Sequence, residues 1–74
     1  MKPRFQPGDR IRVWISQRDD VREGDAGTVI TVSHGPSSFE TFYLDVILDT
    51  GIRLGHYHER AFIEEAAYDP EIPF

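Results

Sequence analysis

The sequence predicts an all-β fold, a small five-stranded barrel with one short helical turn before the last strand. Several segments alternate apolar and polar residues with a period of two, which is typical of half-buried strands. Turn clusters rich in glycine, proline and aspartate separate these segments, and no stretch has the periodicity of a helix of normal length. In a chain of 74 residues, closure into a barrel is favoured because it leaves few strand edges exposed.

The first strand is predicted after a Pro-Gly-Asp turn at residues 7–9, within the stretch FQPGDRIRVWIS. Side chains alternate between apolar and polar or bulky types from residue 10 to residue 15, so one face of the strand should be buried and the other exposed. The residues expected to face inward are Ile11, Val13 and Ile15. The residues expected on the outer face are Arg10, Arg12 and Trp14.

A polar loop and a second strand follow. The stretch QRDDVREGD, residues 17–25, has neither strand nor helix periodicity and is expected to be a surface loop. The β-branched stretch AGTVITV, residues 26–32, predicts the second strand, which ends at the turn cluster SHGPSS. Gly24 and Gly27 lie where a tight barrel needs backbone conformations or close approaches that a Cβ would obstruct.

The third and fourth strands form the longest predicted hairpin. The third strand lies within FETFYLDVILD, and a tight turn at residues 49–51 leads into the fourth strand, IRLGHYH. The residues of the third strand expected to face inward are Phe42, Leu44, Val46 and Leu48. Those expected on its outer face are Tyr43, Asp45 and Ile47.

The C-terminal part is predicted to close the domain. The stretch ERAF can supply a single helical turn, and IEEA a short last strand. We expect the barrel to cover residues 5–66 and an acidic, proline-containing tail to cover residues 67–74. Pro70 and Pro73 have PxxP spacing, so the tail is either a short docking peptide or an ordinary terminus that frays or packs across the barrel.

Composition excludes several classes of protein. The chain contains no cysteine, which excludes disulfides, thiolate zinc sites and a thiol nucleophile. Its apolar runs are too short to span a bilayer, and its first residues lack a secretory hydrophobic region. We therefore expect a soluble, cytoplasmic protein with no membrane partner.

Charge is unevenly distributed along the chain. Acidic residues outnumber basic ones by 13 to 8, which gives a net charge of −5. Residues 1–22 carry a net charge of +3, whereas residues 23–74 carry −8. The overall charge disfavours a phosphate backbone at long range, although a basic N-terminal strand could attract an anionic partner locally. The alternative is that the charges are scattered and only keep a small barrel soluble.

Four segments, in the order PGDRIRV, REGDAGTVITV, YLDVILDTG and YHERAFIEE, resemble the SH3-like barrels of the electron-transport accessory group. This group includes the variable chain of ferredoxin-thioredoxin reductase, the small stromal subunit of photosystem I and the β-subunit of nitrile hydratase. The chain also resembles the KOW element of ribosomal and transcription-elongation proteins, in which a glycine before a β-branched pair starts the second strand. Gly27 would fill that role.

The resemblance spans about residues 5–66 and carries two implications. YHERAF is similar to the family's turn into the last strand, which implies that Tyr57 and Phe62 fill the end of the barrel. The resemblance also implies that such chains stabilise or orient a redox or metalloenzyme partner.

His56 and His58 lie two residues apart in the predicted fourth strand, with Glu59 beside them. Strand alternation directs both histidines to the same face, and if Tyr57 faces inward both lie on the outer surface. Two histidines are too few ligands for a closed tetrahedral site, so a zinc site would need Glu59 or His34 as well. We expect no bound metal, and histidines that either have no special role or contact a partner with some pH dependence.

Trp14, the only tryptophan in the chain, shares its expected face with Arg10 and Arg12. An exposed aromatic side chain between arginines is a plausible anchor for a protein or a nucleic acid. Tyr43 and Ile47 could belong to the same patch, whereas in the alternative Trp14 is covered by the first loop or by the tail. The residues predicted to bind a partner are Arg10, Arg12, Trp14 and Tyr43.

Catalysis finds little support in the sequence. There is no nucleophile elbow or phosphate loop, and the acidic cluster of the first loop is read as a solvated surface. That cluster comprises Asp19, Asp20, Glu23 and Asp25. We expect no enzyme activity and no cofactor.

The leading hypothesis is a non-catalytic accessory or adaptor module that binds a larger protein through its outer sheet face and first loop. The alternative is a KOW-type nucleic-acid-binding module, and the third possibility is self-association through an open strand edge. The basic residues that the nucleic-acid alternative would use are Lys2, Arg4, Arg10, Arg12, Arg18 and Arg22.

Overall fold

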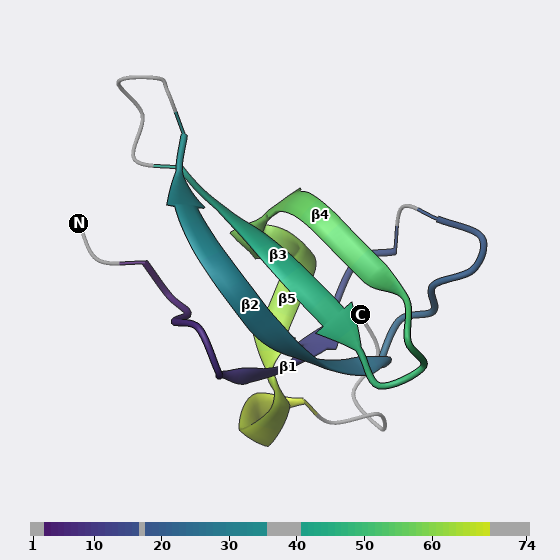
Figure 1. The fold of residues 1–74 in the computed structure, drawn as a ribbon. Helices are drawn as coiled ribbons and strands as arrows, with labels where there is room; N and C mark the ends of the chain where they lie inside the picture. The colour runs from purple at the N-terminus through teal and green to yellow at the C-terminus, as the bar shows by residue number, and fades with distance from the viewer. Residues whose placement is uncertain (1–2, 17, 36–40, 69–74) are drawn as a thin grey trace.

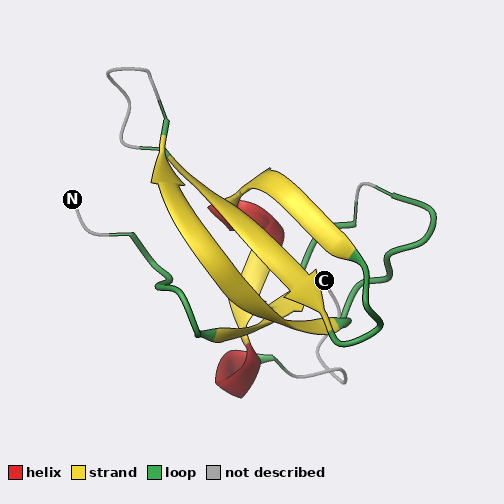
Figure 2. Ribbon diagram, viewed as in Figure 1, coloured by secondary structure: helices red, strands yellow, loops and turns green. Residues whose placement is uncertain are grey.

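The computed structural model describes residues 3–16, 18–35 and 41–68. Its strands are β1 (Arg10–Val13), β2 (Ala26–His34), β3 (Phe42–Leu48), β4 (Arg53–His58) and β5 (Phe62–Glu64). They form one antiparallel sheet in the order β4-β3-β2-β1-β5 (Figure 1). Two 3₁₀ turns, η1 (Glu59–Ala61) and η2 (Glu65–Ala67), lie at the two ends of β5 (Figure 2). The predicted all-β fold, with five strands and a helical turn before the last one, is confirmed.

All five strands contribute to a single apolar core. In Figure 1, β1 and β5 pass behind the long, twisted β2 and β3, so the sheet curls around its own inner face. Leu54 of β4 and Phe62 of β5 belong to the same buried cluster, although these strands stand at opposite ends of the sheet order. The rings of Tyr57 and Phe62 lie 6.2 Å apart between their centroids, which brings the two end strands together on one side of the core.

The alternation of β3 matches the prediction at every position. Its inward residues, Phe42, Leu44, Val46 and Leu48, are at most 8% exposed. The three residues between them are half-buried or exposed, and Ile47 is the most exposed of them at 42%. A central strand with one solvated face has this pattern because successive side chains point to opposite faces of the sheet.

The prediction that Ile15 faces the core is wrong. β1 ends at Val13, and the backbone N–H groups of Trp14 and Ile15 both donate to the carbonyl oxygen of Ala61, at 2.8 and 3.2 Å. Two consecutive donors to one acceptor break the strand alternation, so the side chain of Ile15 turns outward and is 50% exposed.

Two core residues lie outside both the strands and the 3₁₀ turns and carry no periodic signal. Phe5 is fully buried, and Val21 is 5% exposed although it stands in the polar first loop. The hydroxyl of Ser16 donates to the carbonyl oxygens of Arg18 and Val21, which folds the loop back so that Val21 reaches the core. A single apolar residue in an irregular segment cannot be assigned to a face from the sequence, because no repeat defines one.

The expectations for Gly24 and Gly27 are confirmed. A Cβ on Gly27 would lie 2.7 Å from the carbonyl oxygen of Ile47, so the close approach of β2 and β3 requires glycine there. Gly24 has a φ of +93°, and a Cβ on it would collide with the hydroxyl group of Tyr68. Both glycines therefore support the packing of the sheet and its C-terminal turn.

The last predicted strand is shorter than expected. β5 ends at Glu64, and Glu65 and Ala66 belong to η2 rather than to a strand. Of the predicted tail, residues 69–74 lie outside the described residues, as do residues 36–40 of the turn between β2 and β3. Throughout the described part of the chain, the helical segments are turns of three residues, and none approaches the length needed to cross a membrane.

Candidate functional site

The structure separates the four residues predicted to bind a partner. Arg10 and Arg12 belong to an ion-pair network on β1, and Trp14 lies beyond the end of that strand. Arg10 of β1 pairs with Thr28 of β2, whereas Tyr43 of β3 pairs with Ser33 of β2. These two positions are five residues apart, or roughly 16 Å along a strand. The four residues therefore do not form one patch.

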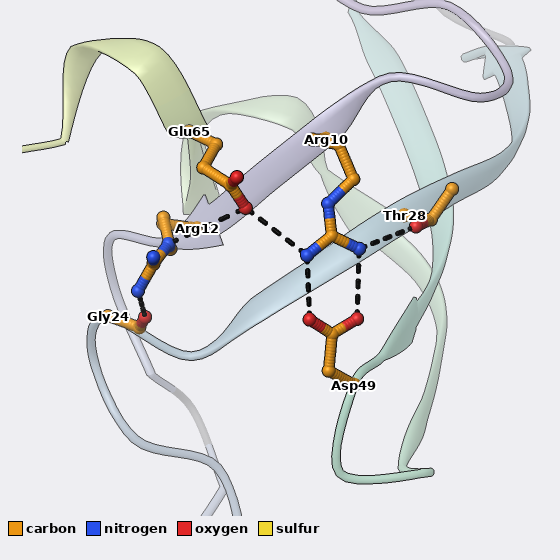
Figure 3. A network of polar contacts seen from close by, with 6 residues as sticks. All are labelled: Arg10, Arg12, Gly24, Thr28, Asp49 and Glu65. Carbon is orange, nitrogen blue, oxygen red and sulfur yellow. Dashed lines mark hydrogen bonds and ion pairs between the residues drawn. The ribbon is translucent and has the colours of Figure 1, made fainter.

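The first group is the arginine network, formed by Arg10, Arg12, Thr28, Asp49 and Glu65 with the carbonyl oxygen of Gly24 (Figure 3). Arg10 makes a bidentate pair with Asp49, at 2.9 Å from Nη1 to Oδ1 and 2.6 Å from Nη2 to Oδ2. Its Nη1 also donates to the hydroxyl of Thr28 at 2.9 Å, and its Nη2 to Oε2 of Glu65 at 3.2 Å. The guanidinium thus ties β1 to β2, to the β3–β4 turn and to η2.

Arg12 lies on the side of Glu65 that faces away from Arg10 (Figure 3). Its Nη1 donates to the carbonyl oxygen of Gly24 at 2.9 Å, and its guanidinium lies 5.4 Å from the ring centroid of Tyr68. Its Nε is buried 3.7 Å from Oε2 of Glu65, which is close enough for electrostatic attraction but too far for a hydrogen bond. Arg12 therefore joins the first loop to η2.

The network keeps its own charges in the ionised form. The hydrogen bond from Arg10 is the main cause that lowers the pKa of Asp49, and the same bond raises the pKa of Arg10. A phosphate that approached Arg10 would have to compete with a bidentate carboxylate already in place. Arg10 and Arg12 were predicted to bind a partner. In the structure, both side chains are engaged by groups of the same chain.

The second group, called here the groove, is a surface hollow of about 490 Å³ beyond the end of β1. Its lining combines exposed and half-buried apolar side chains with two arginines, and Phe62 forms its buried floor. The lining residues are Arg4, Trp14, Ile15, Arg60, Phe62 and Ile63. Trp14 was predicted as a protein-contact residue, and Arg4 was named only for the nucleic-acid alternative. The other four were not predicted as contacts, because they come from separate segments and Ile15 was assigned to the core.

The turn η1 positions most of the groove. The carbonyl oxygen of Ala61 accepts hydrogen bonds from the backbones of Trp14 and Ile15. The carboxylate of Glu59 accepts from the backbone N–H of Arg4 at 3.3 Å. The turn thereby brings the N-terminal segment and the end of β1 to the same place.

His58 caps η1. Its Nδ1 accepts a hydrogen bond from the backbone N–H of Arg60 at 3.0 Å, which satisfies one of the free donors at the start of the turn. The ring nitrogen that accepts this bond must be unprotonated. The orientation of Arg60 in the groove therefore depends on a side chain of β4.

The two arginines of the groove differ from those of the network. Among the described residues, no carboxylate forms an ion pair with the guanidinium of Arg4 or of Arg60. The guanidinium of Arg4 lies 5.3 Å from the ring centroid of Phe5, beside an apolar surface rather than an acidic one. The groove is therefore apolar in its lining and positively charged at its margin.

The third group is the tyrosine–histidine cluster, formed by Tyr43, His56 and His58 on the outer face of β3 and β4. The ring of Tyr43 stacks on His56 at 4.6 Å with 7° between the planes, and meets His58 edge-on at 5.8 Å. Both histidines thus lie on the same outer face, as the sequence predicted.

The backbone of His56 has a special conformation. Its φ is +60°, and its N–H donates to Oδ1 of Asp45 at 2.7 Å. The pairing of β3 with β4 shifts between Leu44 and Val46, which marks a bulge on β4 at this point. The bond from His56 is the main cause that lowers the pKa of Asp45, and the hydroxyl of Thr31 adds to it.

The possible metal site suggested by the histidine spacing is not assembled among the described residues. There, no three histidine or carboxylate side chains gather closely enough to hold an ion. His34 stacks on Phe42 at 4.9 Å, and Nδ1 of His58 is taken by the cap of η1. These contacts give each of the two histidines a role in packing or capping.

A second hollow, of about 590 Å³, lies beside the network and is lined by Asp9, Arg10, Glu64, Glu65 and Ala66. It is larger than the groove, but its surface is formed mainly by charged side chains, two of which already pair with one another. Sites that bind a ligand usually combine an apolar lining with a few polar groups, so the groove is the better candidate.

Two of the four carboxylates in the acidic cluster of the first loop are engaged locally. Asp25 accepts a hydrogen bond from the backbone of Arg22, and Asp20 pairs with Arg18 at 2.6 Å. These contacts agree with the prediction of a solvated loop surface.

The chain matches no protein-family model, and no curated protein and no solved structure is significantly similar to it.

Proposed function

We propose that the protein is a non-catalytic accessory module that binds another protein through the groove. The observation that carries this proposal is the position of Ile15. It is the more exposed of the two large apolar side chains that stand out from the described surface, and it lies beside Trp14 in a hollow. Apolar side chains grouped around an aromatic residue in a concave surface are typical of protein-binding sites.

The hydrogen bonds that hold the backbone beside the groove support the proposal. Because Ala61 and Glu59 fix the backbone on both sides of the groove by hydrogen bonds, its shape exists before a ligand arrives. A preformed surface loses little conformational entropy on binding, which leaves more of the contact energy for affinity.

Two other observations favour binding over catalysis and over nucleic acid. Asp45 and Asp49 have lowered pKa values, which makes them weaker bases than free aspartate and poor general acid–base groups at neutral pH. Arg10 and Arg12, which a nucleic-acid-binding module would use, are occupied by Asp49, Glu65 and the Gly24 carbonyl.

Site-specific photo-crosslinking tests the proposal. A photoreactive residue at position 15 is expected to crosslink to one discrete protein in native lysate. The same residue at position 47 serves as a matched control, because Ile47 is also an exposed isoleucine, at 42%, but lies outside the groove.

The comparison of the two positions decides the outcome. A product that appears at position 15, is absent at position 47 and disappears with an Arg60→Ala substitution supports the groove. Equal products from both positions, or none from position 15, would contradict the proposal.

A further inference from the structure

We infer that the groove takes an extended segment of a partner protein in which carboxylate side chains flank an aromatic or aliphatic side chain. This inference rests on the proposed function and adds the chemistry of the ligand. It follows from three features of the groove: the charge at its margin, the shape of its apolar lining and the lack of any ion pair between its two arginines and a described carboxylate.

The charge comes from Arg4 and Arg60. They belong to separate segments and line the same hollow, yet no described carboxylate pairs with either one. A guanidinium beside an apolar surface recognises a carboxylate strongly, because two parallel hydrogen bonds form where water is partly excluded. The groove therefore offers two sites for acidic side chains.

The net charge of the protein, −5, does not prevent this recognition. At physiological ionic strength, charges further away than about 8 Å are largely screened. The acidic groups nearest to the network are neutralised by its own arginines, as in the bidentate pair of Asp49 with Arg10. Beside the groove, the carboxylate of Glu59 accepts the backbone N–H of Arg4 and forms no ion pair with either arginine, so both guanidinium groups remain open to an acidic side chain.

The apolar lining selects what lies between the carboxylates. Trp14 and Ile63 are half-buried, Ile15 is exposed, and Phe62 closes the floor. A hollow of about 490 Å³ that is open to solvent has room for one or two side chains of an extended peptide. Burial of an apolar side chain there would contribute more to affinity than either exposed arginine supplies alone.

A segment of RNA could also offer negative charge and a stacking group to such a surface. The lining favours a peptide, because the aliphatic side chains of Ile15 and Ile63 border the groove, and Phe62 is buried in its floor and cannot stack on a base. Single-stranded nucleic acid is usually held by aromatic platforms and a continuous basic track. Here the basic residues of β1 are engaged in the arginine network.

Selection from a displayed library of random peptides tests the inference. The wild-type protein is the bait, and an Ile15→Glu variant removes peptides that do not need the groove. Because Ile15 is 50% exposed, this variant is expected to fold, which its circular dichroism spectrum checks. Enriched peptides are expected to carry Asp or Glu on both sides of Phe, Trp, Leu or Ile.

One enriched peptide is then measured against single variants by isothermal titration calorimetry. Arg4→Ala and Arg60→Ala are each expected to weaken its binding about tenfold, in line with the loss of a charge-assisted hydrogen bond. Arg53→Ala is the matched control, because Arg53 is exposed, forms no ion pair with a described residue and lies outside the groove. It is expected to change binding less than twofold.

Each result has a distinct meaning. If no peptide depends on the groove, the proposed function fails together with the inference. If groove-dependent peptides are neutral or basic, or ignore Arg4→Ala and Arg60→Ala, the inference fails while the proposed function stands. If an oligonucleotide binds instead and is lost in Ile15→Glu, both are overturned.

The chain's own C-terminal segment is a further possible occupant. Residues 69–74, outside the described part of the structure, contain two acids together with Ile72 and Phe74. If a variant that ends at Tyr68 binds the acidic peptide and the full chain does not, the groove belongs to this segment. That result would overturn the assignment to a partner protein.

Discussion

The arginine network and the groove adjoin along the β1–β5 strand pair, where Arg12 of the network pairs with Ile63 of the groove, and they extend from there toward its opposite ends. β1 starts at Arg10 in the network and leads to Trp14 in the groove, while β5 starts at Phe62 in the groove and leads to Glu65 in the network. In the network, both guanidinium groups are held by carboxylate or carbonyl groups of the same chain. In the groove, both guanidinium groups lie beside apolar side chains, without a described acidic partner.

The difference shows that the role of an arginine here depends on which acids the fold brings to it. Asp49 is 39 residues from Arg10 in sequence, and Glu65 is 55 residues away. At one end of the two strands, carboxylates pair with guanidinium groups and produce a structural tie. At the other end, the carboxylate of Glu59 bonds to the backbone N–H of Arg4, which leaves the guanidinium charge for a ligand. Four predictions test this contrast, beginning with the largest effect.

Of the substitutions considered, Gly24→Ala should destabilise the protein most, and it acts at the arginine network. Gly24 has a φ of +93°, and a Cβ would collide with the hydroxyl group of Tyr68, whose ring Arg12 contacts. We expect the free energy of unfolding to fall by about 1–3 kcal/mol, as a strained conformation is combined with a displaced ring. Urea unfolding followed by tryptophan fluorescence measures it.

Gly8→Ala is the matched control for this substitution. Gly8 has nearly the same φ, +94°, but a Cβ there would meet no atom within 4 Å. It should therefore report the conformational cost alone. Equal losses for the two variants would show that Tyr68 does not pack as described.

The His58→Ala substitution should act on the groove end. It removes the cap of η1 and should lower the free energy of unfolding by about 1 kcal/mol. Binding of an acidic peptide should weaken with it, because Arg60 loses its backbone support. His58→Asn supplies another capping acceptor and should restore much of both losses. If the asparagine variant behaves like the alanine variant, the cap is not what positions Arg60.

One arginine of each site can be replaced by alanine to compare the two sites directly. Arg10→Ala should lower the urea midpoint of unfolding, because it removes a bidentate pair, and should leave peptide binding within twofold of wild type. Arg60→Ala should leave the midpoint nearly unchanged and weaken binding. The contrast would be lost if both substitutions changed stability and binding alike.

The smallest effect should be the pH dependence of the network. The pKa of Asp49 is lowered in the folded state, so its contribution to stability is complete above the unfolded value, about 3.9. It declines as pH falls through the lower folded value. The difference in stability between wild type and Asp49→Asn should therefore be constant above about pH 5 and shrink below about pH 4. A difference that grew on acidification would contradict the pairing with Arg10.

Strand type and inward faces could be read from local patterns. The alternation from Phe42 to Leu48 was enough to assign every side chain of β3, because the period of a strand is a property of neighbouring residues. The same rule failed at Ile15, where hydrogen bonds to Ala61 end the alternation. The rule could not be applied to Phe5 or Val21, because these two buried residues lie in segments outside the strands.

The candidate site was less accessible to prediction than the fold. Trp14 and the outward-facing histidines could be selected by residue type and alternation. Arg4 and Arg60, in contrast, meet only because η1 brings the N-terminal segment beside the end of β1. Arg10, Arg12 and Trp14 do not form the expected patch, because the two arginines form ion pairs with acidic residues distant in sequence.

By itself, the sequence determined the all-β class, the turns and the inward side of the long strands, since these depend on residue type and on spacing over a few positions. Only the tertiary structure decided which arginines are paired and which border an apolar hollow. Ion pairing and burial depend on distances between segments far apart in the chain, and those distances exist only once the sheet has curled around its core.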